Sequence, residues 1–305
     1  MLEKYTKRIL TAKVYDAAIE TPLDIATSLS NRLGNRILIK REDLQSVFSF
    51  KIRGAYNMIA NLTRAQKEAG IICASAGNHA QGVAQSAKLM GIKATIVMPV
   101  TTPPIKVNSV RSRGGKVVLH GDSFDEAYAH AVMLQEENSL TFVHPYDDPG
   151  VIAGQGTIAR EILHQHSPDG IEAIFVPVGG GGLAAGISAY IKYLRPEIKV
   201  IAVEYEESAC LAAAMKTGRR TTLKEVGLFA DGIAVAQIGK ETFKVLKECI
   251  DEVITVSADE ICAAIKDIFD DTRSVAEPAG AAATAGLKKY VDNPLGKNDS
   301  VRRST

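Results

Sequence analysis

The chain has 305 residues, of which 46% are hydrophobic and 23% charged, and its 36 basic and 35 acidic residues leave a formal net charge of +1. This profile is typical of an ordinary globular protein with a large core, built as two lobes or as one large α/β unit. Because the charge is balanced, the sequence lacks the overall basicity expected of a protein that binds nucleic acid or an anionic membrane.

The chain begins with MLEKYTKRIL, which lacks the apolar core of a signal peptide, and no later apolar run approaches the ~18 residues of a membrane span. Short Val- and Ile-rich runs then alternate with longer helical patterns. These runs are apolar throughout, as expected for strands covered on both faces. They comprise residues 36–40, 70–75, 94–99, 116–120, 173–178, 199–204 and 251–256.

Two of the intervening helices have clear signals. Residues 78–90 place small and apolar side chains on one helical face, and a capping box at Ser123-Phe-Asp-Glu126 starts a helix that runs to about Asn138. The alternation predicts an α/β fold with parallel sheets. We expect the Pro- and Gly-rich residues 145–156 to cross between two lobes and residues 294–305 to form a frayed tail.

The four cysteines lie far apart and form no C-x-x-C pair. Three have apolar surroundings, so we expect buried free thiols and a cytoplasmic location. The cysteines are Cys73, Cys210, Cys249 and Cys262.

Four consecutive glycines, Gly179, Gly180, Gly181 and Gly182, separate an apolar strand pattern from the helical pattern LAAGISAYIKYL. Such a run is costly to order, so it needs a physical reason. Bare glycines let main-chain N–H groups approach an anion, and the start of the following helix adds a positive end. We therefore predict a phosphate site rather than a simple tight turn.

A dinucleotide fingerprint is the alternative interpretation of this run. Gly179-x-Gly181-x-x-Ala184 matches its G-x-G-x-x-A form, and Glu204 ends the next strand near the expected ribose-binding carboxylate. That fingerprint needs no four-glycine run, however, and it leaves the rest of the chain unexplained. A Walker A loop is absent, because no Gly-Lys-Ser/Thr follows the glycines.

A second unusual stretch is SVFSFKIRGA, in which Lys51 lies between Phe50 and Ile52. Burial lowers the pKa of a lysine, and a neutral amine is what a Schiff base or a proton abstraction requires. Taken alone, the stretch fits better a lysine that extends its ammonium group into water from a helix start.

A third stretch, CASAGNHAQG, passes from a strand to a helix through Ser75, Ala76, Gly77 and Asn78. The free N–H groups at this helix start make a second anion site, suited to a carboxylate. Asn78 alone is also a common N-cap. An amine, a phosphate site and a carboxylate site together fit pyridoxal phosphate holding an amino acid.

The chain resembles the fold-type II pyridoxal-phosphate enzymes, and within them the catalytic domain of the biosynthetic threonine dehydratases. The resemblance runs from about residue 14 to residue 290 and rests on six motifs: SFKIRGA, SAGNHAQG, HPYDDPGVIAGQGT, VPVGGGGLAAG, GLFADGIAV and AEPAGA. It implies a two-lobed, tryptophan synthase β-like α/β fold with parallel twisted sheets. A small domain of residues 48–148 would be inserted into a large cofactor-binding domain of residues 1–47 and 149–305.

The same resemblance implies the roles of the site residues. Lys51 binds pyridoxal 5′-phosphate as a Schiff base and later removes the Cα proton of the substrate. The four glycines and the N–H of Leu183 hold the cofactor phosphate, and Asn78 hydrogen-bonds the ring hydroxyl. The substrate carboxylate is bound by Ser75, Ala76, Gly77 and Asn78.

The implied reaction eliminates water from L-threonine and yields 2-oxobutanoate and ammonia, the committed step towards isoleucine, with L-serine as a slower substrate. We also expect Gly181→Asp to weaken cofactor binding more than folding. The reason is that a side chain at position 181 would fill the space where N–H groups meet the phosphate.

Serine dehydratases and serine racemases share these motifs and stay open as alternatives. The racemases carry a divalent-metal site with a carboxylate six positions after the residue that matches Glu204, and here that position is Cys210. The six histidines offer no substitute, and His79 fits packing better than acid–base chemistry. We therefore predict no divalent metal.

The chain departs from the family at its end. The family's Ser-Gly-Ala-Asn or Ser-Gly-Gly-Asn turn, whose serine meets the pyridine nitrogen, is expected shortly after LKKYV, where this chain reads DNPLGKNDSVRRST. We also expect no regulatory domain of the kind that follows in the family. A catalytically impaired, cofactor-binding chain therefore stays open. By resemblance alone, we expect a homo-oligomer, a dimer or a tetramer, whose substrate is a small molecule, an amino acid.

Overall fold

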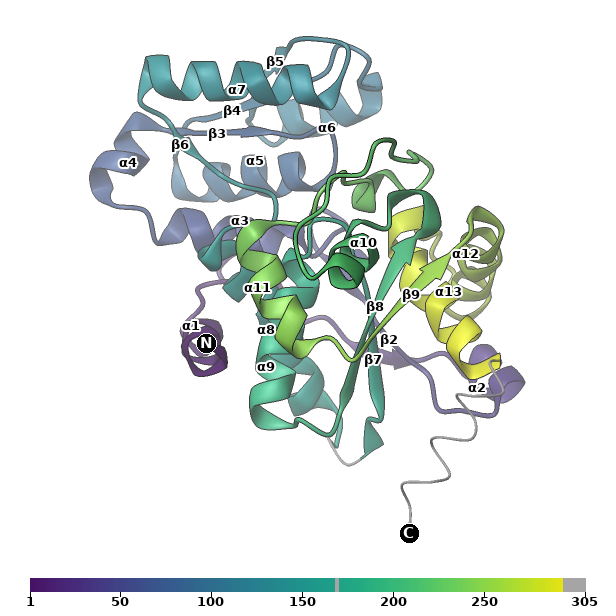
Figure 1. Cartoon of the computed structure of the whole chain (residues 1–305). Coiled ribbons are helices and arrows are strands. Elements are labelled where there is room, and N and C mark those ends of the chain that lie inside the picture. The colour runs from purple at the N-terminus through teal and green to yellow at the C-terminus, as the bar shows by residue number, and fades with distance from the viewer. Residues whose placement is uncertain (168–169, 293–305) are drawn as a thin grey trace. The chain divides into compact units, whose positions relative to one another are not determined.

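The computed structural model describes residues 1–167 and 170–292 (Figure 1). Its contacts divide the chain into two compact units. Unit 1 comprises residues 1–21 and 42–161, and unit 2 comprises residues 22–41 and 162–305. Unit 1 contains all of the expected inserted domain together with flanking residues, and the expected domain boundaries themselves stay a prediction.

Unit 1 is built on a four-stranded parallel sheet. In spatial order its strands are β5 (Lys116–Leu119), β4 (Ala94–Met98), β3 (Ile71–Ala74) and β6 (Thr141–Phe142). Its helices are α1 (Leu2–Leu10), η1 (Glu42–Leu44), α3 (Lys51–Ala60), α4 (Arg64–Ala69), α5 (Asn78–Met90), α6 (Pro104–Ser112), α7 (Phe124–Asn138) and most of α8 (Pro149–Gln165).

Side chains of the central strand β3 alternate between two cores. Ile71 and Cys73 pack in the cluster that includes α5 and α6, whereas Ile72 and Ala74 pack against α7. The helices α5 and α7 accordingly lie on opposite faces of the sheet (Figure 1). Covering both faces explains why this strand is apolar throughout.

Unit 2 contains a three-stranded parallel sheet and a separate antiparallel ribbon. The sheet strands are β7 (Ala173–Pro177), β8 (Lys199–Tyr205) and β9 (Glu252–Val256), and the ribbon strands are β1 (Leu23–Ile25) and β2 (Leu38–Lys40). The helices are α2 (Thr27–Leu33), α9 (Gly182–Leu194), η3 (Glu206–Ser208), α10 (Cys210–Thr217), η4 (Asp231–Ile233), α11 (Lys240–Cys249), α12 (Ala258–Thr272) and α13 (Pro278–Asp292).

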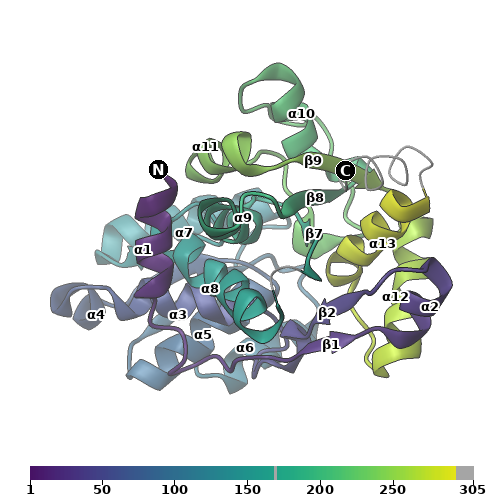
Figure 2. The same ribbon diagram turned by 90° about the horizontal axis from the view of Figure 1, so that it is seen from below.

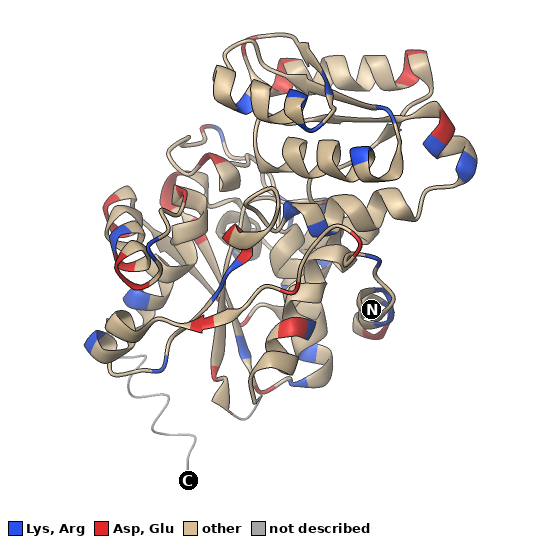
Figure 3. Ribbon diagram, turned by 180° about the vertical axis from the view of Figure 1, so that it is seen from behind, with Lys and Arg blue, Asp and Glu red and all other residues tan. Residues whose placement is uncertain are grey.

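The sheet of unit 2 is also covered on both faces. Figure 2 shows α9 and α13 on opposite sides of it, and both helices contact β7 and β8. Ile201 and Val203 of β8 pack in the core that α12 and α13 complete. Basic and acidic residues are interspersed on the helices of both units, in line with the balanced charge of the sequence (Figure 3).

The predicted α/β fold is confirmed, and each predicted strand overlaps an observed one. The capping box at Ser123 and Glu126 is present at the start of α7. β1 and β6, of 3 and 2 residues, were missed, because neither lies in a longer apolar run like the one that predicted β2. Among the described strands, only β1 and β2 pair in an antiparallel direction, which differs from the predicted parallel pairing. Three cysteines are buried as expected, and Cys262 is exposed.

Much of the expected crossing at residues 145–156 is helical, because α8 begins at Pro149, and the whole stretch lies in unit 1. Proline is well suited to the first turn of a helix. Gly154 serves packing rather than a break, since a Cβ there would lie 2.6 Å from the carbonyl oxygen of Arg53 and 2.6 Å from the Cα of Gly54. The glycines therefore allow α3 and α8 to touch. The predicted tail and the position expected for the family's serine-containing turn lie outside the described residues.

Candidate active site

Lys51 is the first residue of α3 and is half-buried. Its Nζ donates to the carbonyl oxygen of Pro145 at 3.3 Å and lies 5.3 Å from the centroid of the Phe50 ring. A half-buried position beside an aromatic ring combines an apolar environment with access for a reactant. This placement fits a reactive amine better than it fits an ammonium group that only extends into water.

A buried ionic cluster fixes α3 just beyond this lysine. Arg53 is fully buried, and its guanidinium donates to Glu42 at 2.7 and 2.8 Å, to Thr157 at 3.1 Å and to both carboxylate oxygens of Glu161. A buried charge needs such partners, and leaving one unpaired is strongly destabilising. The cluster ties α3 to η1 and α8, and so sets the position of Lys51.

The turn from Ser75 to Asn78 connects β3 to α5. The N–H of Ser75 donates to Val97 at 3.1 Å, which extends the pairing of the sheet, and the N–H of Gly77 donates to the Ser75 hydroxyl at 3.3 Å. Asn78 is the first residue of α5. The first N–H groups of a helix have no intrahelical acceptor, so this turn can bind a carboxylate.

Gly82 brings this turn close to Lys51 within unit 1. A Cβ at position 82 would lie 3.1 Å from the carbonyl carbon of Lys51 and 3.2 Å from the nitrogen of Ile52. The absence of a side chain therefore lets α5 pack directly against the start of α3. The structure thus places the main chain of Lys51 beside α5, the helix that the predicted carboxylate turn opens.

His79 packs inside unit 1, as the sequence suggested. It is buried, and its Nε2 lies 2.8 Å from the carbonyl oxygen of Val143. Burial, followed by the nearby positive charge of Lys51, lowers the pKa of His79 to about 3. The ring is therefore neutral near pH 7.

In unit 2, Gly179, Gly180 and Gly181 lie between β7 and α9, Gly182 is the first residue of α9, and all four are buried. Gly181 precedes α9 with a φ of +92°, a left-handed conformation that favours glycine. The first bond of the helix runs from the N–H of Ala185 to the carbonyl of Gly181 at 2.8 Å. The N–H groups of Gly182, Leu183 and Ala184 come before that bond, so the turn fits an anion.

The side-chain positions of two glycines face the protein interior. A Cβ on Gly179 would lie 2.8 Å from the Cα of Ile233. A Cβ on Gly181 would lie 2.8 Å from Leu246, 2.9 Å from Ile238 and 3.1 Å from Thr242. The reason given for Gly181→Asp is therefore wrong: the new side chain would first meet the core, so loss of folding is expected alongside loss of binding.

Two family motifs without an assigned role support the glycine turn. Ile233, in GLFADGIAV, is the residue that packs against Gly179. Behind it, a Cβ on Gly232 would lie 2.8 Å from the Cβ of Ala279, in AEPAGA. These contacts join segments that are far apart in the chain, and no local sequence signal predicts them.

Glu204 has a structural role at the start of α10. Both of its carboxylate oxygens accept main-chain N–H groups at the start of α10, from Leu211 at 2.7 Å and from Ala212 at 2.8 Å. Burial raises the pKa of Glu204 to about 7, although the two N–H donors oppose this shift. A fully buried carboxylate with both oxygens engaged does not bind a ribose, which removes the main support for the dinucleotide alternative.

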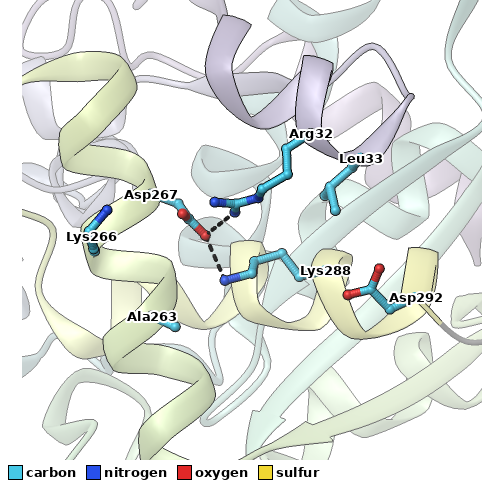
Figure 4. A pocket seen from close by; sticks show the side chains of 7 residues that line it. All are labelled: Arg32, Leu33, Ala263, Lys266, Asp267, Lys288 and Asp292. Carbon is cyan, nitrogen blue, oxygen red and sulfur yellow. Dashed lines mark ion pairs between the residues drawn. The ribbon is translucent and has the colours of Figure 1, made fainter.

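The described residues 1–167 and 170–292 contain no group of three or more His, Cys, Asp or Glu side chains that could hold a metal ion. A cavity of about 440 Å³ in unit 2 contains none of the predicted site residues (Figure 4). Its lining includes Asp267, which accepts ion pairs from Arg32 and Lys288, each at 2.6 Å. These pairs fasten α2 to α12 and α13, so the cluster has a structural explanation.

Residues 14–301 match the model of a family described as pyridoxal-phosphate dependent enzymes. The chain is 60% identical over 300 residues to a biosynthetic L-threonine dehydratase of Burkholderia multivorans; this covers 97% of the chain and 59% of that relative. Within the part of the chain that the structure describes, no helix is long and apolar enough to span a bilayer.

Two solved structures extend the comparison. The processed form of threonine deaminase isoform 2 from Solanum lycopersicum is 50% identical, with a TM-score of 0.93, covering 95% of this chain and 84% of that one. Maize serine racemase is 32% identical, with a TM-score of 0.88, covering 97% of this chain and 88% of that one. The fold is shared with both, and the sequence is more similar to the deaminase.

Proposed function

Because the chain belongs to the family of pyridoxal-phosphate dependent enzymes, we propose that it converts L-threonine to 2-oxobutanoate and ammonia, with L-serine as a slower substrate. The observation that carries this proposal is the 50% identity to a threonine deaminase over 84% of that chain. The lower identity of 32% to a serine racemase favours elimination over racemisation.

The residues of each unit fit pyridoxal phosphate. In unit 2, the N–H groups of Gly182 and Leu183 at the start of α9 suit a phosphate dianion. In unit 1, Lys51 offers a primary amine that can bond to the cofactor's aldehyde carbon. Asn78, at the start of α5, is assigned to the ring hydroxyl.

Bound pyridoxal phosphate supplies an electron sink that makes the Cα–H of an amino acid acidic. The N-terminal turn of α5 binds the substrate carboxylate and so orients the Cα–H bond. Lys51, once its amine is no longer bonded to the cofactor, would accept the Cα proton at Nζ. The β-hydroxyl takes up a proton and leaves as water, which creates the Cα–Cβ double bond. Water then hydrolyses the enamine product to 2-oxobutanoate and ammonia.

The test is turnover of L-threonine by the purified holoprotein. We expect 2-oxobutanoate and ammonia in equal amounts, a lower kcat/KM for L-serine, and a loss of at least about 10³-fold in Lys51→Ala. Formation of D-serine from L-serine without ammonia would favour the racemase alternative. Cofactor bound without any turnover would favour the impaired chain.

We further propose that the protein acts in the cytoplasm as a homo-oligomer and needs no divalent metal. Light scattering during gel filtration measures the oligomeric state. Turnover that is lost with a chelator and restored by a divalent cation would contradict the metal-free assignment.

A further inference from the structure

The carbonyl groups of the glycine turn are held by residues from other elements of unit 2. The carbonyl oxygen of Gly180 accepts from the Thr242 hydroxyl at 2.8 Å and from the N–H of Gly239 at 3.3 Å. The carbonyl oxygen of Gly179 accepts from the Cys210 thiol at 3.5 Å. Thr242 is fully buried in the first turn of α11, so its hydroxyl is directed at the loop.

Peptide geometry converts these contacts into directions for N–H groups. In a planar trans peptide, the carbonyl of one residue and the N–H of the next point in opposite directions. Fixing the carbonyl of Gly180 towards α11 therefore fixes the N–H of Gly181 away from α11. The contact of the Cys210 thiol with the carbonyl of Gly179 favours the same orientation for the N–H of Gly180, but more weakly, because a thiol is a poor donor.

This constraint matters because glycine offers the least resistance to rotation of its peptide planes. A run of four glycines can present its N–H groups in many orientations, and a preorganised anion site requires one. Thr242 supplies a strong neutral donor at 2.8 Å, whereas the Gly239 contact at 3.3 Å is longer. The side chain also packs at the glycine turn, where a Cβ on Gly181 would lie 3.1 Å from the Cβ of Thr242.

We propose that Thr242 is a positioning residue for the phosphate site: its hydroxyl holds the Gly180–Gly181 peptide so that the Gly181 N–H is directed at the cofactor phosphate. The inference rests on the proposed function, since it assumes that the glycine turn binds the phosphate of pyridoxal phosphate. It adds a side chain from α11 to a site otherwise made of main chain.

The experiment compares pyridoxal 5′-phosphate with pyridoxal, which lacks the phosphate, in titrations of the apoprotein. Thr242→Val removes the hydroxyl but keeps the volume, and we expect it to raise the Kd for pyridoxal phosphate about 10-fold while leaving the Kd for pyridoxal unchanged. Thr242→Ser keeps the hydroxyl and should restore most of the preference. Thr242→Ala serves the same test if the valine variant does not fold.

Thr272→Val is the matched control, because Thr272 donates to the carbonyl of Ile268 at 2.7 Å in the same unit but away from the glycine turn. It should bind both compounds like the wild type. A folded Thr242→Val with an unchanged preference for the phosphate would overturn the inference alone. Equal weakening of both compounds would also overturn it, as a merely structural effect. A wild type without any preference for the phosphate would instead refute the proposed function, and the inference with it.

Discussion

Two strand-to-helix turns, Ser75–Asn78 in unit 1 and Gly179–Gly182 in unit 2, are proposed as anion sites and are held in different ways. Each follows a parallel strand and opens a helix of 13 residues. The first is closed locally, because the hydroxyl of Ser75 accepts the N–H of Gly77 at 3.3 Å. The second has no side chains of its own and is held by Thr242, 62 residues along the chain. A turn without side chains thus depends on its neighbours.

This difference is tested most strongly by placing alanine in each turn. Gly181→Ala should cost about 2–5 kcal/mol of unfolding free energy, because its φ is left-handed and its Cβ would meet the core. Gly77→Ala is the matched control, since nothing lies within 4 Å of its Cβ position, and should cost less than about 1 kcal/mol. Denaturant unfolding measures both, and equal losses would remove the distinction.

The stability contributions of Glu204 in unit 2 and His79 in unit 1 should also change with pH in opposite directions. Burial raises the pKa of Glu204 from 4.5 to about 7, so the folded chain retains this proton. The associated stability is present below pH 4.5 and is lost as the pH rises through 7, by about 1–3 kcal/mol. Glu204→Gln should remove this slope, at the cost of one N–H bond at every pH. Unfolding free energies measured from pH 5 to 8 test this prediction. If the pH dependence persists in Glu204→Gln, another group causes it.

His79, in the first turn of α5, gives unit 1 the reverse dependence. Its pKa is lowered from 6.5 to about 3, so its contribution is present above pH 6.5 and is lost as the pH falls towards 3. His79→Gln should reduce the acid sensitivity of unfolding, again by about 1–3 kcal/mol at most. If the variant loses stability between pH 6.5 and 4 as steeply as the wild type, other groups cause the loss.

The smallest effect is expected for the hydrogen bond between the Gly77 N–H and the Ser75 hydroxyl in the first turn. Ser75→Ala removes one neutral hydrogen bond and should cost about 1 kcal/mol or less. If the turn binds the substrate carboxylate, the KM for L-threonine should rise by about 10-fold or less, while the preference for pyridoxal phosphate over pyridoxal stays unchanged. A loss of that preference would place Ser75 at the phosphate instead.

The sequence predicted the elements whose signals are local. The apolar strands, the capping box of Ser123 and Glu126, and the helix starts after Ser75 and after the glycines all depend on neighbouring residues, and the structure contains them. The family motifs extended the prediction to the roles of Lys51 and Asn78, which remain predictions. Local patterns thus sufficed for the α/β fold and for the two strand-to-helix turns, whose binding of anions stays a prediction.

The remaining features depend on contacts between distant segments. Gly154 looked like part of a linker because its partner, Arg53, is about a hundred positions away in the chain. Gly181 looked open to the phosphate because Leu246 and Ile238 come much later in the sequence. Likewise, nothing next to Thr242 indicates that its hydroxyl meets the glycine turn. Such features appear only when the chain is folded.

The central claim, that Lys51 is the residue that bonds to pyridoxal phosphate, is tested most directly by borohydride reduction of the holoprotein followed by peptide mapping. We predict that the pyridoxyl group is found on Lys51 in the wild type and on no lysine in Lys51→Arg, because a guanidinium cannot replace the amine. A label on another lysine of the folded wild type, or an undiminished label in Lys51→Arg, would contradict the claim.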